Sequence, residues 1–322
     1  MSQLDATSKI NMRQHVKYMS DAEQPRSAFS HAALAKLSGL NRTQVDEFAA
    51  TWSGLAIHER LRIVRTLSDM AFDNVELDFN DLFIRFLSDP SAEIRAVALE
   101  GLWEDDRPST ADAMIKLIRD DADEGVRASG LDGIGRFANR IALGEVNRHL
   151  AERIRQVLRD YVGPTTSHFL RGRAIAAAGY ITEPEFQEAT RLAYGAEDLG
   201  VRASAVEAMG RSCNEKWFDI IAREFASEYP ELRFESARAA GETEDERFLP
   251  ALVEALGDED SEVRLAAIEA LGAIGGPRAR QALHQVKQNG DVAMQEAADL
   301  ALDELEVIND PLGVRVQDMS KN

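Results

Sequence analysis

An apolar residue followed by arginine recurs along this chain at a nearly constant interval. The pairs are Ile94-Arg95, Val126-Arg127, Leu170-Arg171, Val201-Arg202, Leu232-Arg233 and Val263-Arg264, and successive arginines are 32, 44, 31, 31 and 31 residues apart. Self-similarity at such a period is typical of stacked units that contact only their neighbours, rather than of one closed core. The sequence therefore predicts a solenoid.

The residues after each arginine have the spacing of a buried helix face. Three positions on lies a small residue, which lets a neighbouring helix approach closely: Ala98, Gly130, Ala174, Ala205, Ser236 and Ala267. Four and seven positions on lie apolar residues: Leu99 and Leu102, Leu131 and Ile134, Ile175 and Ala178, Val206 and Met209, Ala237 and Ala240, Ile268 and Leu271. This spacing predicts an amphipathic helix in every unit, which we call the B helix.

Glycine occupies the eighth position after most of the arginines. The column consists of Gly135, Gly179, Gly210, Gly241 and Gly272, and Trp103 breaks it. Glycine is favoured where a helix ends, because a positive φ costs it no Cβ clash. We therefore expect the B helices to end at this column.

A second apolar-periodic stretch precedes each B helix. Examples are residues 82–87, 113–118, 217–221 and 249–256, and the turns between the two stretches are rich in Asp, Ser and Pro. Such residues favour turns and helix N-caps, so each unit reads as an A helix, a short turn and a B helix. One short helix pair cannot bury its own apolar faces, but a stack can. We predict an all-α fold, a right-handed α-solenoid of stacked helix pairs.

The segment Glu262–Gly272 and the stretch after it resemble the HEAT repeat, in particular the short HEAT-like repeats of phycobilisome-lyase type proteins. The resemblance covers roughly residues 57–305. It implies a ladder between units that joins turn aspartates to B-helix arginines, here Asp89/Arg95, Asp121/Arg127 and Asp258/Arg264. Ser227 and Ala196 stand where two other units would carry the aspartate, so we expect an incomplete ladder.

The ends of the chain depart from the repeat. Residues 1–28 are polar and aperiodic and predict a flexible arm. Residues 29–75 predict an N-terminal helical cap, with helices over 32–37, 45–55 and 57–73 and with Phe48 and Trp52 as its anchors. Residues 76–305 form the predicted repeat solenoid, and residues 306–322 a C-terminal tail.

Composition narrows the function classes. The formal charge is −19, which disfavours binding to nucleic acid or to anionic membranes. Cys213 is the lone cysteine, the histidines are scattered, and no phosphate-loop or nucleophile motif occurs. We therefore expect a cytoplasmic protein with no catalytic residue, metal site or cofactor.

The B helices of such a solenoid line its inner face, and five positions after the arginine this face is mostly acidic. We predict a groove for a protein partner that offers a basic or amphipathic helix. The predicted partner-binding residues are Glu100, Trp103, Asp132, Glu207, Phe234 and Glu269. The alternative is an ordinary solvated helix face.

The long interval between Arg127 and Arg171 holds a predicted amphipathic helix over about 144–162. From Arg136 to Arg173 the chain carries eight arginines against three acids, a local charge of +5. One hypothesis is a docking site for an acidic or phosphorylated ligand at Arg148, Arg153, Arg155 and Arg159. The alternative is that these arginines pair with neighbouring acidic units and cover apolar surface with their stems.

Together these features predict a non-enzymatic scaffold that binds a partner protein. The resemblance alone implies the alternative, a bilin lyase-like or chaperone protein that handles a chromophore-bearing partner. A third hypothesis, DNA-damage handling as in HEAT-like DNA glycosylases, would need a basic groove, and the acidic stripe argues against it.

Overall fold

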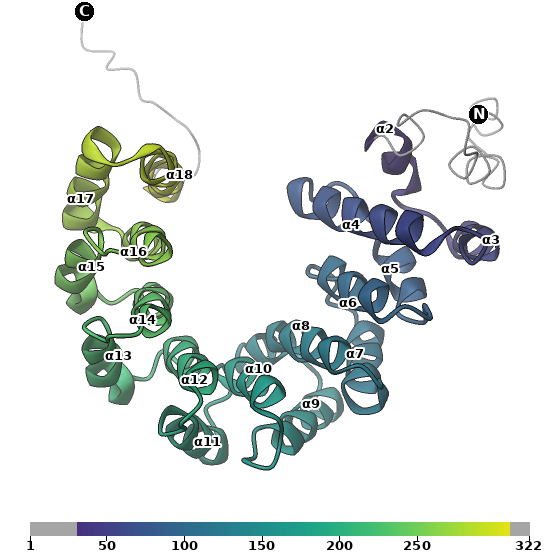
Figure 1. Cartoon of the computed structure of the whole chain (residues 1–322), viewed down its shortest axis with the longest axis horizontal. Coiled ribbons are helices and arrows are strands. Elements are labelled where there is room, and N and C mark those ends of the chain that lie inside the picture. Colours follow the sequence, from purple (N-terminus) through teal and green to yellow (C-terminus); the bar gives the residue numbers. More distant parts are fainter. Residues whose placement is uncertain (1–30, 310–322) are drawn as a thin grey trace, which may run out of the picture. The chain divides into compact units, whose positions relative to one another are not determined.

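The computed structural model describes residues 31–309, and every regular element in that range is a helix. The predicted arm over 1–28 and the end of the predicted tail lie outside the described residues. The described chain forms two compact units (Figure 1). One contains the chain up to Phe137 together with Val146–Val157, and the other contains Ala138–Glu145 and the chain from Leu158 onward.

The first unit contains the helices of the predicted cap and the first repeats. They are α2 (His31–Leu34), η2 (Ala35–Leu37), α3 (Arg42–Trp52), α4 (Ile57–Asp73), α5 (Asn80–Phe86), α6 (Ala92–Gly101), α7 (Pro108–Asp120), most of α8 (Glu124–Ala142) and most of α9 (Arg148–Tyr161). α9 is the amphipathic helix predicted in the long interval. The boundary between the units falls within α8 and α9.

The second unit continues the same alternation. Its helices are α10 (His168–Ala178), α11 (Pro184–Tyr194), α12 (Leu199–Arg211), η3 (Glu215–Trp217), α13 (Phe218–Glu224), α14 (Pro230–Thr243), η4 (Glu246–Phe248), α15 (Leu249–Ala255), α16 (Ser261–Ile274), α17 (Gly276–Asn289) and α18 (Val292–Asn309). α18 runs past Leu305, where the sequence predicted its end. The B helices α10, α12, α14, α16 and α18 pack each on the next in one layer, and the A helices form the other layer (Figure 1). The predicted all-α solenoid architecture is confirmed.

The predicted apolar columns form the core. Leu99, Val206 and Ile268 at the fourth position are at most 1% exposed, and Leu102 and Met209 at the seventh are fully buried. The column of small residues faces the A helix of its own unit. Ser236 shows this, because its hydroxyl donates to the carbonyl of Ile221 in α13 over 2.9 Å.

The glycine column has a different cause from the one predicted. Gly179 does end α10 as expected, although with φ of −54°, whereas Gly210 and Gly241 lie inside α12 and α14. The described glycines with positive φ are Gly39, Gly144, Gly275 and Gly276. A Cβ on Gly210 would lie 2.5 Å from the Cα of Ala239 in the next B helix. A Cβ on Gly179 would likewise lie 2.7 Å from the Cα of Ala208, and one on Gly241 would lie 3.0 Å from the Cα of Ala270. A Cβ on Gly272 would lie 3.0 Å from the Cβ of Ala301 and 3.5 Å from its Cα. Glycine is needed here because successive B helices touch backbone to backbone.

The sequence predicts a residue with positive φ at the glycine column, but at these helix ends the residues with positive φ lie three positions after that column. Cys213, Glu244 and Gly275 each stand eleven residues after the arginine of their unit, with φ of 46°, 51° and 68°. Only the last of the three is a glycine. The helix end was missed in sequence because two units accept a strained side chain there.

The predicted ladder of aspartate and arginine is present between units. The guanidinium of Arg95 donates to both carboxylate oxygens of Asp121 over 2.7 Å, and Arg233 does the same to Asp258 over 2.7 and 2.8 Å. Within one unit, the aspartate and the arginine six residues later are joined through the backbone of the turn and not through the carboxylate. Nη1 of Arg95 donates to the backbone carbonyl of Asp89 over 2.8 Å, and Nη1 of Arg233 to that of Ser227 over 3.0 Å. Because this acceptor is backbone, Ser227 can replace aspartate without loss of the turn contact.

The helix pair α3 and α4 joins the same ladder. Arg60 is the fourth residue of α4, as the repeat arginines are of their helices, and it pairs with Asp89 of the next unit. Trp52 also donates to Asp89, over 2.7 Å, and stacks on Phe86 at 4.1 Å between centroids. The predicted anchoring role of Trp52 and Phe48 is confirmed, since their side chains are 7% and 0% exposed.

Replacing Gly210 by alanine tests the contact between B helices. Alanine favours a helix by about 1 kcal/mol, but its Cβ would press on the backbone of Ala239, which cannot rotate away. We expect Gly210→Ala to lower the free energy of unfolding by roughly 1–3 kcal/mol, measured by denaturant titration. Gly163→Ala is the control, since nothing lies within 4 Å of its Cβ position. Equal stability of the two variants would contradict the role of the glycine column.

Replacing Asp258 by asparagine tests the ladder. The hydrogen bond from Arg233 holds the pKa of Asp258 below its ordinary value. Its stabilising effect is therefore present above the unfolded pKa of about 3.9 and is lost as the pH falls through the lower, folded one. We expect Asp258→Asn to cost about 1–3 kcal/mol at pH 7 and less in acid. Glu259→Gln is the matched control, because Glu259 lies 3.5 Å from the same arginine but is 87% exposed.

Candidate functional site: an acidic hollow in the first unit

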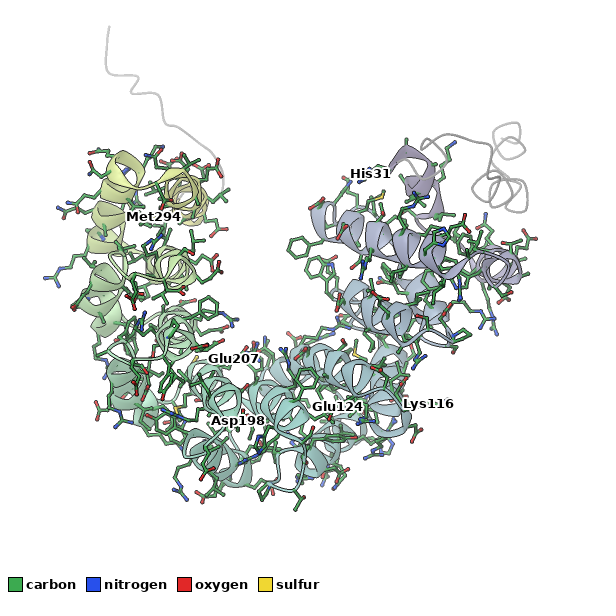
Figure 2. The ribbon with its side chains drawn as sticks, in the orientation of Figure 1. His31, Lys116, Glu124, Asp198, Glu207 and Met294 are labelled. Carbon is green, nitrogen blue, oxygen red and sulfur yellow. The ribbon has the colours of Figure 1, made fainter. Side chains whose placement is uncertain are left out.

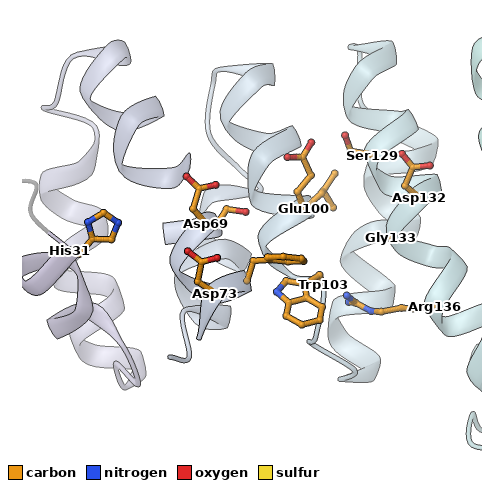
Figure 3. Close-up of a pocket in the computed structure, with 12 residues that line it drawn as sticks. His31, Asp69, Asp73, Glu100, Trp103, Ser129, Asp132, Gly133 and Arg136 are labelled. Carbon is orange, nitrogen blue, oxygen red and sulfur yellow. The ribbon is translucent and has the colours of Figure 1, made fainter. Parts of the chain in front are cut away.

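A hollow of about 880 Å³ lies over the B helices of the first unit (Figure 3). We call it the acidic hollow. Its lining comes from α2, α4, α6 and α8 and from the turn after α6: His31, Ser68, Asp69, Phe72, Asp73, Leu99, Glu100, Trp103, Ser129, Asp132, Gly133 and Arg136. Three of the residues predicted to bind a partner, Glu100, Trp103 and Asp132, therefore share one cavity.

The hollow arises because α6 is short. α6 has 10 residues, whereas its neighbours α4 and α8 have 17 and 19. Trp103 stands in the glycine column, and the helix ends at Gly101 before reaching it. The last turns of α4 and α8 therefore extend beyond α6, and the space between them stays open.

Acidic side chains from three successive B helices line this space. Asp69 and Asp73 lie one turn apart near the end of α4, while Glu100 and Asp132 occupy the fifth position after the arginines of α6 and α8. Stacking in register brings these positions together, as Figure 3 shows. Partial burial raises the pKa of Glu100, and the charge of Arg65 opposes that rise.

Two exposed aromatic rings lie beside these carboxylates. Phe72 is 71% exposed and Trp103 is 39% exposed, and their ring centroids are 5.5 Å apart at an interplanar angle of 51°. Neighbouring exposed rings are unusual on a protein surface, where large apolar groups are normally scattered. Their faces attract cations, and this attraction is stronger where carboxylates lie nearby.

Arg136 is the basic side chain at the edge of the hollow. Its guanidinium donates to the backbone carbonyls of Leu102 and Asp105 in the turn after α6. The arginine thereby joins α8 to this turn. The lining carries four carboxylates against this one arginine and His31.

The other predicted partner-binding residues lie in the second unit. Glu207, on the B-helix layer (Figure 2), lines a hollow of about 540 Å³ together with His168, Asp198 and Glu235. Glu269 lines another of about 390 Å³ beside Arg238. Phe234 lies half-buried against the core, with Arg238 at 5.7 Å from its ring centroid.

Glu235 is a charged residue of this layer that the sequence analysis missed. Arg238 donates to it over 3.2 Å and lies 3.6 Å from Glu207, which in turn pairs with Arg211 at 2.8 Å. Burial, together with the charge of Glu207, raises the pKa of Glu235 to about 7. It was missed because it lies two positions after its arginine, where the other units carry no acidic residue. Those units have Val97, Ser129, Arg173, Ser204 and Ala266 at this position.

The arginines of the basic segment contact acids of neighbouring A helices. Arg153 lies 2.5 Å from Asp112 of α7, and Arg159 lies 2.7 Å from Glu185 of α11. Arg148 is exposed. These ion pairs favour the reading in which the segment holds neighbouring helices together, and a docking role for Arg148, Arg153, Arg155 and Arg159 stays a prediction.

Within residues 31–309, no cluster of three or more His, Cys, Asp or Glu side chains could hold a metal ion. No helix of that range is long and apolar enough to cross a bilayer.

Comparison with protein families assigns the repeat. The family model for HEAT repeats matches residues 215–303, and the contacts that define the stack there recur in the units before it. Residues 215–303 of this chain therefore contain HEAT repeats. Repeats of this kind stack into extended surfaces that bind other proteins.

Solved structures similar to this chain include three from different sources. Human deoxyhypusine hydroxylase in complex with glycerol is 19% identical, with 82% of this chain and 96% of that chain covered and a TM-score of 0.36. The YibA protein of Escherichia coli is 17% identical, with 88% and 99% covered and a TM-score of 0.44. The CpcE–CpcF complex of phycocyanin lyase from Nostoc sp. is 16% identical, with 71% and 94% covered and a TM-score of 0.47. A comparison with curated proteins finds no match.

The raised pKa of Glu235 makes the stability of this protein depend on pH. The folded-state pKa, about 7, lies above the unfolded value, so the stabilising protonated form is lost as the pH rises toward 7. Glu235→Gln keeps a neutral side chain. We expect it to stabilise the protein at pH 8 by on the order of 1–3 kcal/mol and to change little at pH 5, measured by thermal unfolding. Glu231→Gln, at an exposed position of the same helix, is the control. A gain independent of pH would contradict the assignment.

Proposed function

We propose that this HEAT-repeat protein is a non-enzymatic scaffold that holds a basic, amphipathic helix of a partner protein in the acidic hollow. The observation that carries the proposal is the hollow itself. It combines carboxylates from α4, α6 and α8 with the exposed ring pair of Phe72 and Trp103.

The chemistry of the lining favours a cationic ligand. Asp69, Asp73, Glu100 and Asp132 outnumber the basic groups around them. A lysine or arginine placed over Phe72 or Trp103 gains attraction from the ring face and from the nearby carboxylates. The long aliphatic stem of either residue also covers apolar ring surface.

The placement of the acids favours a helix as the ligand. The carboxylates come from three neighbouring helices, and packed helices lie about 8–10 Å apart. A single side chain cannot meet all of them. A helix with basic residues three and four positions apart presents a row of charges that can, with its apolar face toward the rings.

Binding of a designed peptide tests this proposal. The probe is a labelled 18-residue helical peptide of lysine and leucine with amphipathic spacing, and its scrambled isomer is the reference. We expect D69K/E100K/D132K to weaken binding of the helical peptide at least tenfold, measured by fluorescence anisotropy. The milder D69N/E100Q/D132N should weaken it in the same direction, because it removes the charges without reversing them.

The matched control separates local recognition from the overall negative charge. E228K/E254K/E304K makes the same charge change at exposed positions that line none of the three hollows described above. We expect this variant to bind within about twofold of the wild type, since solvent-exposed charges outside the site are screened and contribute little. Equal loss in both variants, or equal binding of the scrambled peptide, would refute the site.

A further inference from the structure

The chain contains a segment with the chemistry that the acidic hollow fits. Residues 6–20 hold no acidic side chain, and Lys9, Arg13 and Lys17 follow one another at intervals of four. Residues four apart lie on one face of a helix, so these three charges would form a single row. The segment thus carries +3 in a chain whose formal charge is −19.

The same segment also has an apolar stripe at helical spacing. Met12, Val16 and Met19 are four and three residues apart, and on a helical wheel they flank the basic row. Methionine adapts to irregular surfaces and packs well against aromatic rings, here those of Phe72 and Trp103. Residues 9–19 therefore offer both features demanded of the partner helix.

The point of attachment places this segment within reach of the hollow. His31, the first residue that the structure describes, itself lines the hollow. Residues 20–30 separate it from the segment, and eleven residues span at most roughly 36–40 Å. A short tether of this kind corresponds to an effective concentration of about 1 mM.

We propose that residues 9–19 occupy the acidic hollow of their own chain, so that a partner must displace them. This inference rests on the hollow being the binding site proposed above. With an intrinsic dissociation constant of about 10–100 μM, the tethered segment fills the hollow in more than roughly nine molecules of ten. A competing ligand then binds about 10–100-fold more weakly than to an open hollow.

Zero-length cross-linking tests the occupancy directly. A carbodiimide joins an amine to a carboxylate only where the two are in contact. We expect links from Lys9 or Lys17 to Asp69, Asp73, Glu100 or Asp132 in the monomer fraction, read by mass spectrometry. Links found only between chains and rising with protein concentration would show a second copy as the occupant and overturn the intrachain arrangement.

Competition in the full-length chain tests the consequence. The probe is a labelled synthetic peptide of residues 6–20, and the variant K9E/R13E/K17E carries a tethered segment that the hollow repels. We expect the peptide to bind this variant at least tenfold more tightly than the wild type. R315E/K321E, which reverses the basic residues of the other terminal segment, is the control and should bind as the wild type does.

The outcomes separate this inference from the proposed function. Equal binding of the peptide to the wild type and to K9E/R13E/K17E would overturn the occupancy and leave the hollow as a binding site. Absence of binding to K9E/R13E/K17E, together with the same affinity for the designed helical peptide in all hollow variants, would overturn both. Adding D69K/E100K/D132K to K9E/R13E/K17E should remove the gained affinity.

Discussion

Contact between glycine and alanine on successive B helices is the constraint on which the rest of this structure depends. A Cβ on Gly179, Gly210 or Gly241 would stand at 2.7, 2.5 or 3.0 Å from the Cα of the alanine opposite. No side chain separates the helices there, so their spacing is set by backbone atoms. Close stacking in turn keeps equivalent positions in register. For that reason Glu207, Arg238 and Glu269, each five residues after its repeat arginine, can act together as one surface, although they come from different helices.

The arginine ladder complements this contact at the start of each B helix. Arg95 and Arg233 each join the turn of their own unit, through a backbone carbonyl, to the aspartate of the next. In the unit of Arg202 the next turn carries Ser227 instead of aspartate, and the guanidinium lies 5.7 Å from the ring centroid of Tyr229. The residue in the turn can therefore differ between repeats, and the arginine still makes a contact there. The ladder uses the start of the helix, whereas the proposed binding residues lie near its middle.

Much of the fold could be predicted from the sequence, because its periodicity reports which helix face is buried. Periodicity does not report which neighbour that face meets, so the glycine column was assigned to helix ends instead of helix contacts. Arg60 was missed because Glu59, not an apolar residue, precedes it, although it stands at the same helical position as the other ladder arginines. In the candidate site, Glu100, Trp103 and Asp132 could be predicted from their columns. Phe72 and Asp69 of this site, and Glu235 of the second unit, could not, since they stand outside those columns and are brought to the surface layer by packing alone.

A regular stack presents the same surface in every repeat, so a local hollow must come from a departure from the repeat. Trp103 is that departure in the first unit. A side chain of its size cannot stand where the other units place glycine against the next helix, and α6 accordingly ends at Gly101. The missing turn removes backbone from between α4 and α8, which opens the hollow, and it turns the indole toward Phe72. A single exchange of glycine for tryptophan thus accounts for the cavity and for the exposed indole beside Phe72. The same column that holds the solenoid together determines where it is open.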